Sequence, residues 1–261
     1  MGSVMSGSAA VVVATGRDPA AFPFRCELSL TPLITFWTQL SAHHEFGRGP
    51  IPGLVREKAR AAPELAEVID DLSVIEKHRG VAVIVIALGP LTNLALALRL
   101  DADALRRTRR VVMMAGAVDV PGNFTPDAEF NAYVDPDAAR EVLDAGLRVD
   151  LVPLDATRQT TINRDQLHAA LAGRPGPLAA RIEALTEQTF RLWGYMHLHD
   201  PLAVGLAVDA SLAQWQPARI AVGESGQTRR AVGAPNCRVA QIIDAERFLA
   251  LFFDRLCPAS S

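Results

Sequence analysis

The sequence predicts a single α/β domain in which helices flank an open, mostly parallel sheet. Apolar, β-branched runs typical of buried strands alternate with segments of helical periodicity, as in βαβ units. The chain has 261 residues, of which 49% are hydrophobic, so it can bury one large core. No segment between these elements is long enough to separate two domains. We therefore expect a flexible leader over residues 1–10 and one domain over residues 11–261.

The strands and helices are expected at short intervals. A β-branched run at residues 9–14 predicts a first strand, and residues 63–78 have the period of an amphipathic helix. Continuous apolar runs predict buried strands at 81–86, 109–114 and 149–153. Two or three short strands are expected after residue 219. Further helices are expected from residue 94, at 136–145, across 165–195 with an interruption at 173–177, and at 245–256.

Residues 81–98 carry no charge over 18 positions, which is the lower limit for a membrane-spanning helix. Gly89-Pro90 and Thr92-Asn93 lie in the middle of this segment. Glycine and proline favour a turn, and threonine or asparagine is a good helix cap. The segment is thus predicted to be a strand, a turn and a helix start, and we expect no association with a membrane.

Charge and cysteine usage exclude other classes. Lysine and arginine number 26 against 29 acidic residues, and a net charge of −3 provides no field for non-specific binding of nucleic acid. Cys26, Cys237 and Cys257 are widely spaced, with no CxxC pair, which argues against a disulfide framework. We expect a protein of a reducing compartment, the cytoplasm.

Three polar clusters follow the predicted strands, at residues 89–93, 123–131 and 154–157. In open parallel sheets, ligands bind at the carboxyl ends of the strands, so these clusters are expected to converge on one site. If residues 129–131 are extended, Glu129 and Asn131 lie on one side of the chain. A carboxylate beside a carboxamide suits vicinal hydroxyls, as on a ribose. The alternative is a loop capped by its own polar side chains.

A second feature is the segment His197-Leu198-His199-Asp200-Pro201. His197 and His199 could serve a zinc hydrolase. Two histidines are a weak zinc signal, however, because catalytic zinc sites usually have three protein ligands. The pair His43-His44 is explained equally well by an exposed loop.

Together these motifs resemble the inosine–uridine nucleoside hydrolases. Residues 86–95 are similar to the GPLTN segment of that family, and the remaining motifs follow in the family's order. They are Met114 to Gly116, Gly122-Asn123, Glu129-Phe130-Asn131, Asp135-Pro136-Asp137-Ala138-Ala139, Pro153 to Thr157, and His199 to Val204. The resemblance covers residues 80–245 and implies the nucleoside-hydrolase fold.

The resemblance implies calcium-dependent hydrolysis of the N-glycosidic bond of a nucleoside, as used in nucleoside salvage. Asn123, Glu129 and Asn131 would hydrogen-bond the ribose hydroxyls, and Met114 would line the sugar pocket. Such a site must hold the sugar, activate water and assist departure of the base. The family also implies a homo-oligomer.

The remaining roles concern the metal and the base. The resemblance implies that Asp200 binds Ca2+ through its carboxylate and Thr92 through its backbone carbonyl. His199 would stand near the departing base as a candidate acid, a role suited to its ordinary pKa near neutrality. Trp193 and Tyr195 could stack on the base, although packing in a helical core explains either one alone.

The sequence departs from the family at its front. The family opens with a strand leading into a DxDxxxDD cluster, whereas residues 1–80 contain only Asp18, Asp70 and Asp71. Calcium prefers six to eight oxygen ligands, so Asp200 and Thr92 alone would hold it weakly. Three hypotheses follow: the true start lies upstream, which we favour; another subunit supplies the cluster; or the chain is an inactive homologue that binds a ligand or a subunit.

Overall fold

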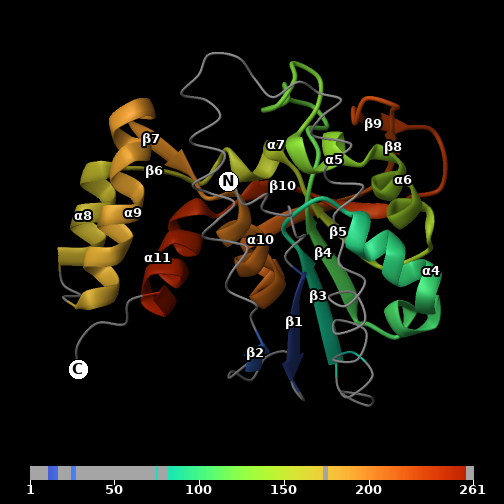
Figure 1. The fold of residues 1–261 in the computed structure, drawn as a ribbon, viewed down its shortest axis with the longest axis horizontal. Helices are drawn as coiled ribbons and strands as arrows, with labels where there is room; N and C mark the ends of the chain where they lie inside the picture. Colours follow the sequence, from blue (N-terminus) through green and yellow to red (C-terminus); the bar gives the residue numbers. More distant parts are fainter. Residues whose placement is uncertain (1–10, 17–24, 28–74, 76–81, 173–175, 257–261) are drawn as a thin grey trace, which may run out of the picture.

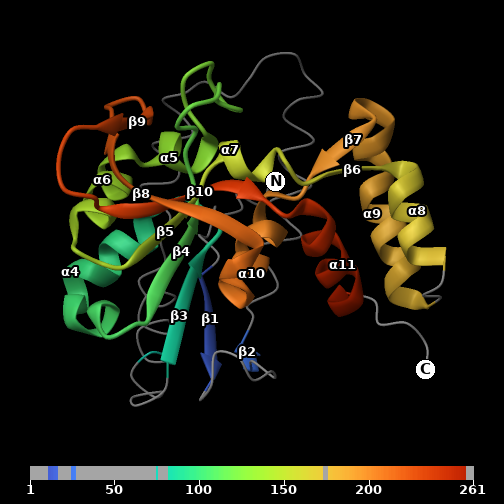
Figure 2. The ribbon, with the colours of Figure 1, turned by 180° about the vertical axis from the view of Figure 1, so that it is seen from behind.

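The computed structural model describes residues 11–16, 25–27, 75, 82–172 and 176–256. Among them, eight strands form one sheet in the order β2-β1-β3-β4-β5-β10-β8-β9. Figures 1 and 2 show this sheet from its two sides. The strands are β1 (Val11–Gly16), β2 (Arg25–Glu27), β3 (Ala82–Ala87), β4 (Arg110–Met114), β5 (Val149–Val152), β8 (Ala213–Val222), β9 (Thr228–Ala231) and β10 (Cys237–Ile243).

The centre of the sheet is parallel. β3 pairs with β4, β4 with β5, and β5 with β10, all in parallel. The outer pairs are antiparallel: β1 with β2 and β3, β8 with β10 and β9. The predicted parallel α/β sheet is thus confirmed for its centre. The antiparallel direction of the outer pairs was not predicted, because the pattern of apolar residues within a strand does not specify the direction of its neighbour.

Helices cover both faces of the sheet. They are α4 (Thr92–Arg106), α5 (Phe130–Val134), α6 (Pro136–Asp144), α7 (Leu154–Thr157), α8 (Arg164–Ala172), α9 (Pro177–Trp193), α10 (His199–Val208) and α11 (Ala245–Leu256), with a 3-10 turn η1 at Ala210–Leu212. Val83 and Val85 of β3 pack in a core with α4 and α6, while Ile84 and Ile86 pack in a second core with α10 and α11. This alternation makes β3 apolar at successive positions, as a strand buried on both faces requires.

Most predicted elements between residues 82 and 256 are confirmed within one or two positions, including the strand, turn and helix start at the uncharged segment. None of the described helices is long and apolar enough to span a membrane. The small sheet of β6 (Thr161–Asn163) and β7 (Tyr195–His197) was not predicted. The expected helix at residues 63–78, apart from Ile75, and the expected leader at 1–10 lie outside the described residues.

A buried ion network joins the central strands at their amino ends. Asp150 on β5 is 2% exposed, and Arg238 on β10 donates to its two oxygens at 2.9 and 2.8 Å. Arg110 on β4 lies 3.4 Å from the same carboxylate. Its guanidinium also donates to the carbonyls of Leu206 and Ala207, at 3.3 and 2.7 Å. The last turn of α10 is thereby held to the sheet, which orients the helix whose first residues are His199 and Asp200.

Candidate functional site

Glu129 lies buried at the carboxyl end of β4 and caps α5. Its carboxylate accepts three backbone N–H groups, from Gly116 at 2.8 Å, Asn131 at 2.9 Å and Ala132 at 3.1 Å. Burial raises the pKa of the Glu129 carboxyl, and the backbone donors act in the opposite direction. The Oε1 atom of Glu129 accepts one of these bonds and the Oε2 atom accepts two.

Asn131 lies beside it, also 2% exposed. Its Nδ2 donates to the carbonyl of Met114 at 2.9 Å and lies 3.5 Å from both the Met114 Sδ and the carbonyl of Leu88. The Asn131 Oδ1 is buried and has no hydrogen-bond partner among the described residues. An unsatisfied buried acceptor costs about 1–3 kcal/mol, so this oxygen is ready for a hydroxyl donor.

The expectation that residues 129–131 are extended is wrong. Only Glu129 has extended backbone angles, and the helix α5 begins at Phe130. Glu129 and Asn131 converge because an N-cap side chain and a residue in the first helical turn both reach back toward the end of β4. The alternative, a segment capped by its own polar side chains, is correct in one respect, since the Glu129 side chain caps α5.

Asn123 lies in the exposed loop that precedes α5. Its Oδ1 accepts the backbone N–H of Phe130 at 3.0 Å, next to Glu129. The Phe124 ring packs on Phe130 and Tyr133, with centroids 5.4 and 4.6 Å apart. The loop is therefore folded onto α5, and Asn123 comes to the same edge of the sheet as Glu129.

His199 and Asp200 form the first turn of α10. The His199 Nδ1 is 2.6 Å from the hydroxyl of Thr157, at the end of α7. Burial, followed by the charges of His197 and Arg158, lowers the pKa of His199 to about 3. Burial and the charge of Glu129 raise the pKa of Asp200 to about 7. The charge of Glu129 thus acts on the carboxyl of Asp200, so these two predicted site residues share one electrostatic environment.

A row of rings leads from the surface to His199. The ring centroids of Tyr195 and His197 are 5.1 Å apart, and those of His197 and His199 are 5.4 Å apart. Trp193 and Tyr195 are 48% and 47% exposed, so core packing does not account for them. The Nδ1 of His197 is 2.6 Å from the hydroxyl of Thr161, so each of the two imidazoles has a threonine hydroxyl as its neighbour.

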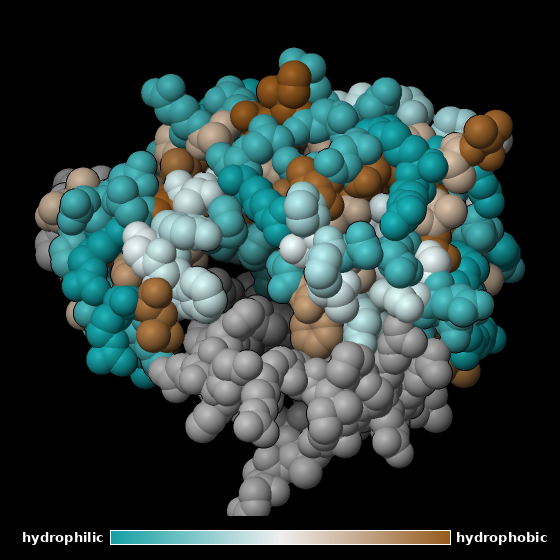
Figure 3. All heavy atoms as spheres, turned by 90° about the horizontal axis from the view of Figure 1, so that it is seen from above, coloured by the Kyte–Doolittle hydropathy of each residue, from teal (hydrophilic) through white to brown (hydrophobic). Residues whose placement is uncertain are grey.

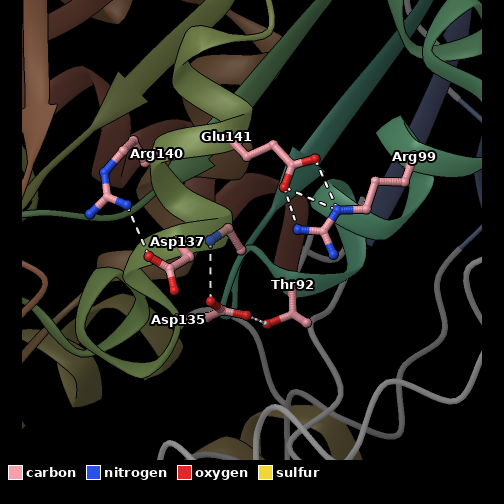
Figure 4. Close-up of polar contacts among 7 residues, drawn as sticks. Thr92, Arg99, Asp135, Asp137, Arg140 and Glu141 are labelled. Carbon is pink, nitrogen blue, oxygen red and sulfur yellow. Dashed lines mark hydrogen bonds and ion pairs between the residues drawn. The ribbon is translucent and has the colours of Figure 1, made fainter. Parts of the chain in front are cut away.

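The Thr92 side chain is bonded to the residue that precedes α6. Its hydroxyl donates to Asp135 Oδ2 at 2.7 Å, while Asp135 Oδ1 caps α6 by accepting the N–H of Ala138 (Figure 4). Thr92 is the first residue of α4, where a carbonyl normally accepts the N–H four residues on. The carbonyl of Leu88, which was not a predicted site group, lies 3.5 Å from the Asn131 Nδ2.

The described residues contain no group of three histidine, cysteine, aspartate or glutamate side chains suited to a metal ion. The zinc-hydrolase alternative thus gains no support from them. Thr157 and Thr161, which hold the two imidazoles, were missed as individual site residues. The only signal was the polar cluster at 154–157, whose hydroxyl faces a histidine more than forty positions along the chain.

The surface at the end of the molecule that carries α5 and α7 is hollowed. Figure 3 looks onto the end of the molecule where α5 and α7 lie, and shows a hollow between the side that carries α8 and α9 and the middle of this face. Hydrophilic residues cover most of this face, with separate hydrophobic residues between them.

The fold and this edge of the sheet define a class of protein, and comparison with known proteins gives the family. Residues 5–250 match the model of the inosine-uridine preferring nucleoside hydrolases. The chain belongs to that family.

Similar proteins include an uncharacterized protein of Schizosaccharomyces pombe, 35% identical over 171 residues, and a pyrimidine-specific ribonucleoside hydrolase of Escherichia coli, 32% identical over 173 residues. These matches cover 63% and 64% of this chain. The chain spans about half the length of these relatives, 55% and 54%. A plant nucleoside hydrolase of known structure is 27% identical with a TM-score of 0.65, covering 71% of this chain and 65% of that one.

Proposed function

We propose that the chain is a nucleoside N-ribohydrolase, which splits the N-glycosidic bond of a purine or pyrimidine ribonucleoside to give ribose and the free base. The observation that carries this proposal is the pair Glu129 and Asn131. Both side chains are buried and held by backbone groups, and the Asn131 Oδ1 has no hydrogen-bond partner among the described residues. Two adjacent acceptors suit the two adjacent hydroxyls of a ribose.

The proposed roles follow from the hydrogen-bonding groups and apolar surface of each side chain. Glu129 and Asn131 would accept hydrogen bonds from ribose hydroxyls, and Met114 would line the sugar pocket. The Asn123 Nδ2 makes no hydrogen bond within the described part of the chain and would donate to the sugar. Holding the ribose in this way converts binding free energy into orientation of the bond to be broken.

His199 would face the departing base, but as a neutral ring. With a pKa of about 3, its imidazole carries no charge at neutral pH. A neutral imidazole can still polarise a leaving group by hydrogen bonding, without first being an imidazolium. The proposed role is therefore that of a hydrogen-bonding partner of the base, with Trp193 and Tyr195 as stacking surfaces at the exposed end of the ring row.

The described residues by themselves do not make a calcium site. Calcium takes six to eight oxygen ligands, and Asp200 is the one carboxylate here that is buried without a hydrogen-bond partner in the described ranges. Its raised pKa fits a carboxylate that a cation would stabilise. We retain Asp200, and Thr92 through its carbonyl, as proposed ligands, but assign no step of the reaction to the metal.

We also propose a homo-oligomer located in the cytoplasm and acting in salvage, with one domain over residues 11–261. Leu178, Leu185 and Leu192 support self-association, because they are 44–48% exposed and recur every seven residues along α9. The buried free thiol of Cys237 is compatible with a reducing compartment.

The second candidate function is a catalytically inactive homologue that binds a nucleoside or another subunit. The scarcity of metal-ligating groups among the described residues favours it. Such a homologue would keep the pair Glu129 and Asn131 for binding ribose but would not activate a water molecule. Binding without turnover would distinguish it from the hydrolase.

The deciding experiment measures release of reducing sugar from inosine and uridine, with calcium added or chelated. Calcium-dependent release that is lost in Glu129→Gln would support the hydrolase. Calorimetric binding of inosine without release would support the inactive homologue. Neither binding nor release from a folded sample would refute the hydrolase and the nucleoside-binding homologue. Asp209→Asn serves as the control, because Asp209 also accepts a backbone N–H as the cap of a helical turn, η1, but lies beyond the far end of α10.

A further inference from the structure

Arg158 connects two parts of the site that are far apart in the sequence. It follows α7 directly, and its guanidinium donates through Nη1 to the carbonyl of Pro121 at 2.7 Å and through Nη2 to the carbonyl of Gly122 at 3.0 Å. These two carbonyls immediately precede Asn123. One planar side chain thus holds the loop at two consecutive peptide groups, a geometry that the guanidinium fork provides and an ammonium does not.

The loop is tightly folded where Arg158 holds it. The N–H of Gly122 donates to the carbonyl of Pro126 at 2.9 Å. A Cβ at Gly122 would collide with the carbonyl oxygens of Ala128 and Thr125, so only glycine fits there. Asn123 is then fixed to α5 through its bond with Phe130. The loop is a unit attached to α5 at one end and to Arg158 at the other.

Arg158 is also adjacent in the chain to a residue that contacts a histidine. The preceding residue, Thr157, contacts His199 through its hydroxyl. No carboxylate forms an ion pair with Arg158 in the parts of the chain that the structure describes. Its two hydrogen bonds go to the loop alone.

We propose that Arg158 is a positioning residue that fixes the Asn123 loop at its distance from the histidine side of the site, and thereby sets the affinity for the nucleoside. The inference rests on the proposed function insofar as the ligand is a nucleoside. Ribose contacts come from the loop side and base contacts from the histidine side. A ligand that contacts both sides needs them held at a fixed distance from each other, and Arg158 fixes that distance.

The test compares Arg158→Met and Arg158→Lys with the control Arg140→Met. Arg140 also donates to a backbone carbonyl, that of Val222, through Nε and Nη2 at 3.2 Å, but it lies on α6 away from the site. Hydrogen exchange of the full-length protein reports on residues 121–130. Calorimetric titration with inosine and steady-state kinetics report affinity, KM and kcat.

We expect Arg158→Met to speed amide exchange in residues 121–130 and to weaken inosine binding about tenfold, which corresponds to about 1.4 kcal/mol. KM should rise similarly while kcat changes by less than about threefold, because uniform binding is lost. Arg158→Lys should recover part of the affinity. Arg140→Met should leave both loop exchange and affinity at the wild-type values.

Two results would overturn the proposal. One is wild-type loop exchange and wild-type affinity in Arg158→Met. The other is faster exchange throughout the protein, which would make Arg158 a general stabilising residue. Failure of the proposed function is separable, because a wild-type protein that neither binds nor hydrolyses inosine leaves the exchange comparison intact, and that comparison decides whether Arg158 holds the loop.

Discussion

Removing the Glu129 carboxylate should destabilise the protein as well as impair its site. In Glu129→Ala, three backbone N–H groups lose their acceptor: those of Asn131 and Ala132 in the first turn of α5, and that of Gly116 beyond β4. Loss of an N-cap costs about 0.5–2 kcal/mol. An unsatisfied buried N–H costs about 1–3 kcal/mol. Release of the carboxylate from its buried position offsets part of this.

The expected loss is therefore roughly 2–4 kcal/mol, measured as a lower midpoint of urea unfolding with an unchanged slope. Glu129→Gln keeps one oxygen acceptor and should lose about half as much. It should nevertheless lose most nucleoside binding, because its amide group donates where a ribose hydroxyl must also donate. Wild-type unfolding and wild-type binding in both variants would refute the network of hydrogen bonds assigned to Glu129.

Three further predictions concern other parts of the molecule. The pKa of His199, about 3 in the folded protein against an ordinary 6.5, means that the unfolded chain binds more protons between these values. In the presence of a chelator, the free energy of unfolding of the wild type minus that of His199→Gln should therefore rise with pH between these values, by up to about 1.4 kcal/mol per pH unit. Urea titrations at several pH values measure this difference, and a constant difference would contradict the prediction. Asp150→Asn should cost about 3–5 kcal/mol because it leaves two arginines without their buried carboxylate, whereas Glu187→Gln, which breaks an exposed ion pair, should cost less than about 1 kcal/mol; equal midpoints of chemical unfolding would show the buried network to be unimportant. Gly205→Ala would bring a Cβ within 2.8–2.9 Å of the Phe248 ring, so a loss of about 1–3 kcal/mol is expected in thermal unfolding, and an unchanged melting temperature would disprove this close packing.

The sequence predicted the parallel centre of the sheet because each of its strands is apolar at successive positions. In Val83 to Ile86 both faces are buried, and such a run has few other interpretations. The three-residue strands of β6 and β7 were missed, since they are too short to establish a period and depend on each other for pairing. Tertiary contacts, which no local pattern carries, decide such elements.

The site was predictable in its parts and less so in its geometry. Polar clusters after successive strands correctly pointed to one edge, because parallel strands end together. The helix at Phe130 was missed because a single turn has too little periodicity to detect. The neutral state of His199 was also missed, since its low pKa comes first from burial and then from the charges of His197 and Arg158, and burial is not visible in the residues around position 199.

The arrangement of the sheet has a consequence for synthesis of the chain. β5 receives its second neighbour, β10, only after more than eighty further residues have been made, and β8 and β9 join the sheet through β10. Until Cys237–Ile243 leaves the ribosome, β5 is an open edge of unpaired peptide groups with apolar residues on both faces, the kind of edge that pairs readily with other chains. A nascent chain arrested just before Cys237 would therefore be prone to aggregate and to need a chaperone, although nearly all of its site residues had already been synthesised.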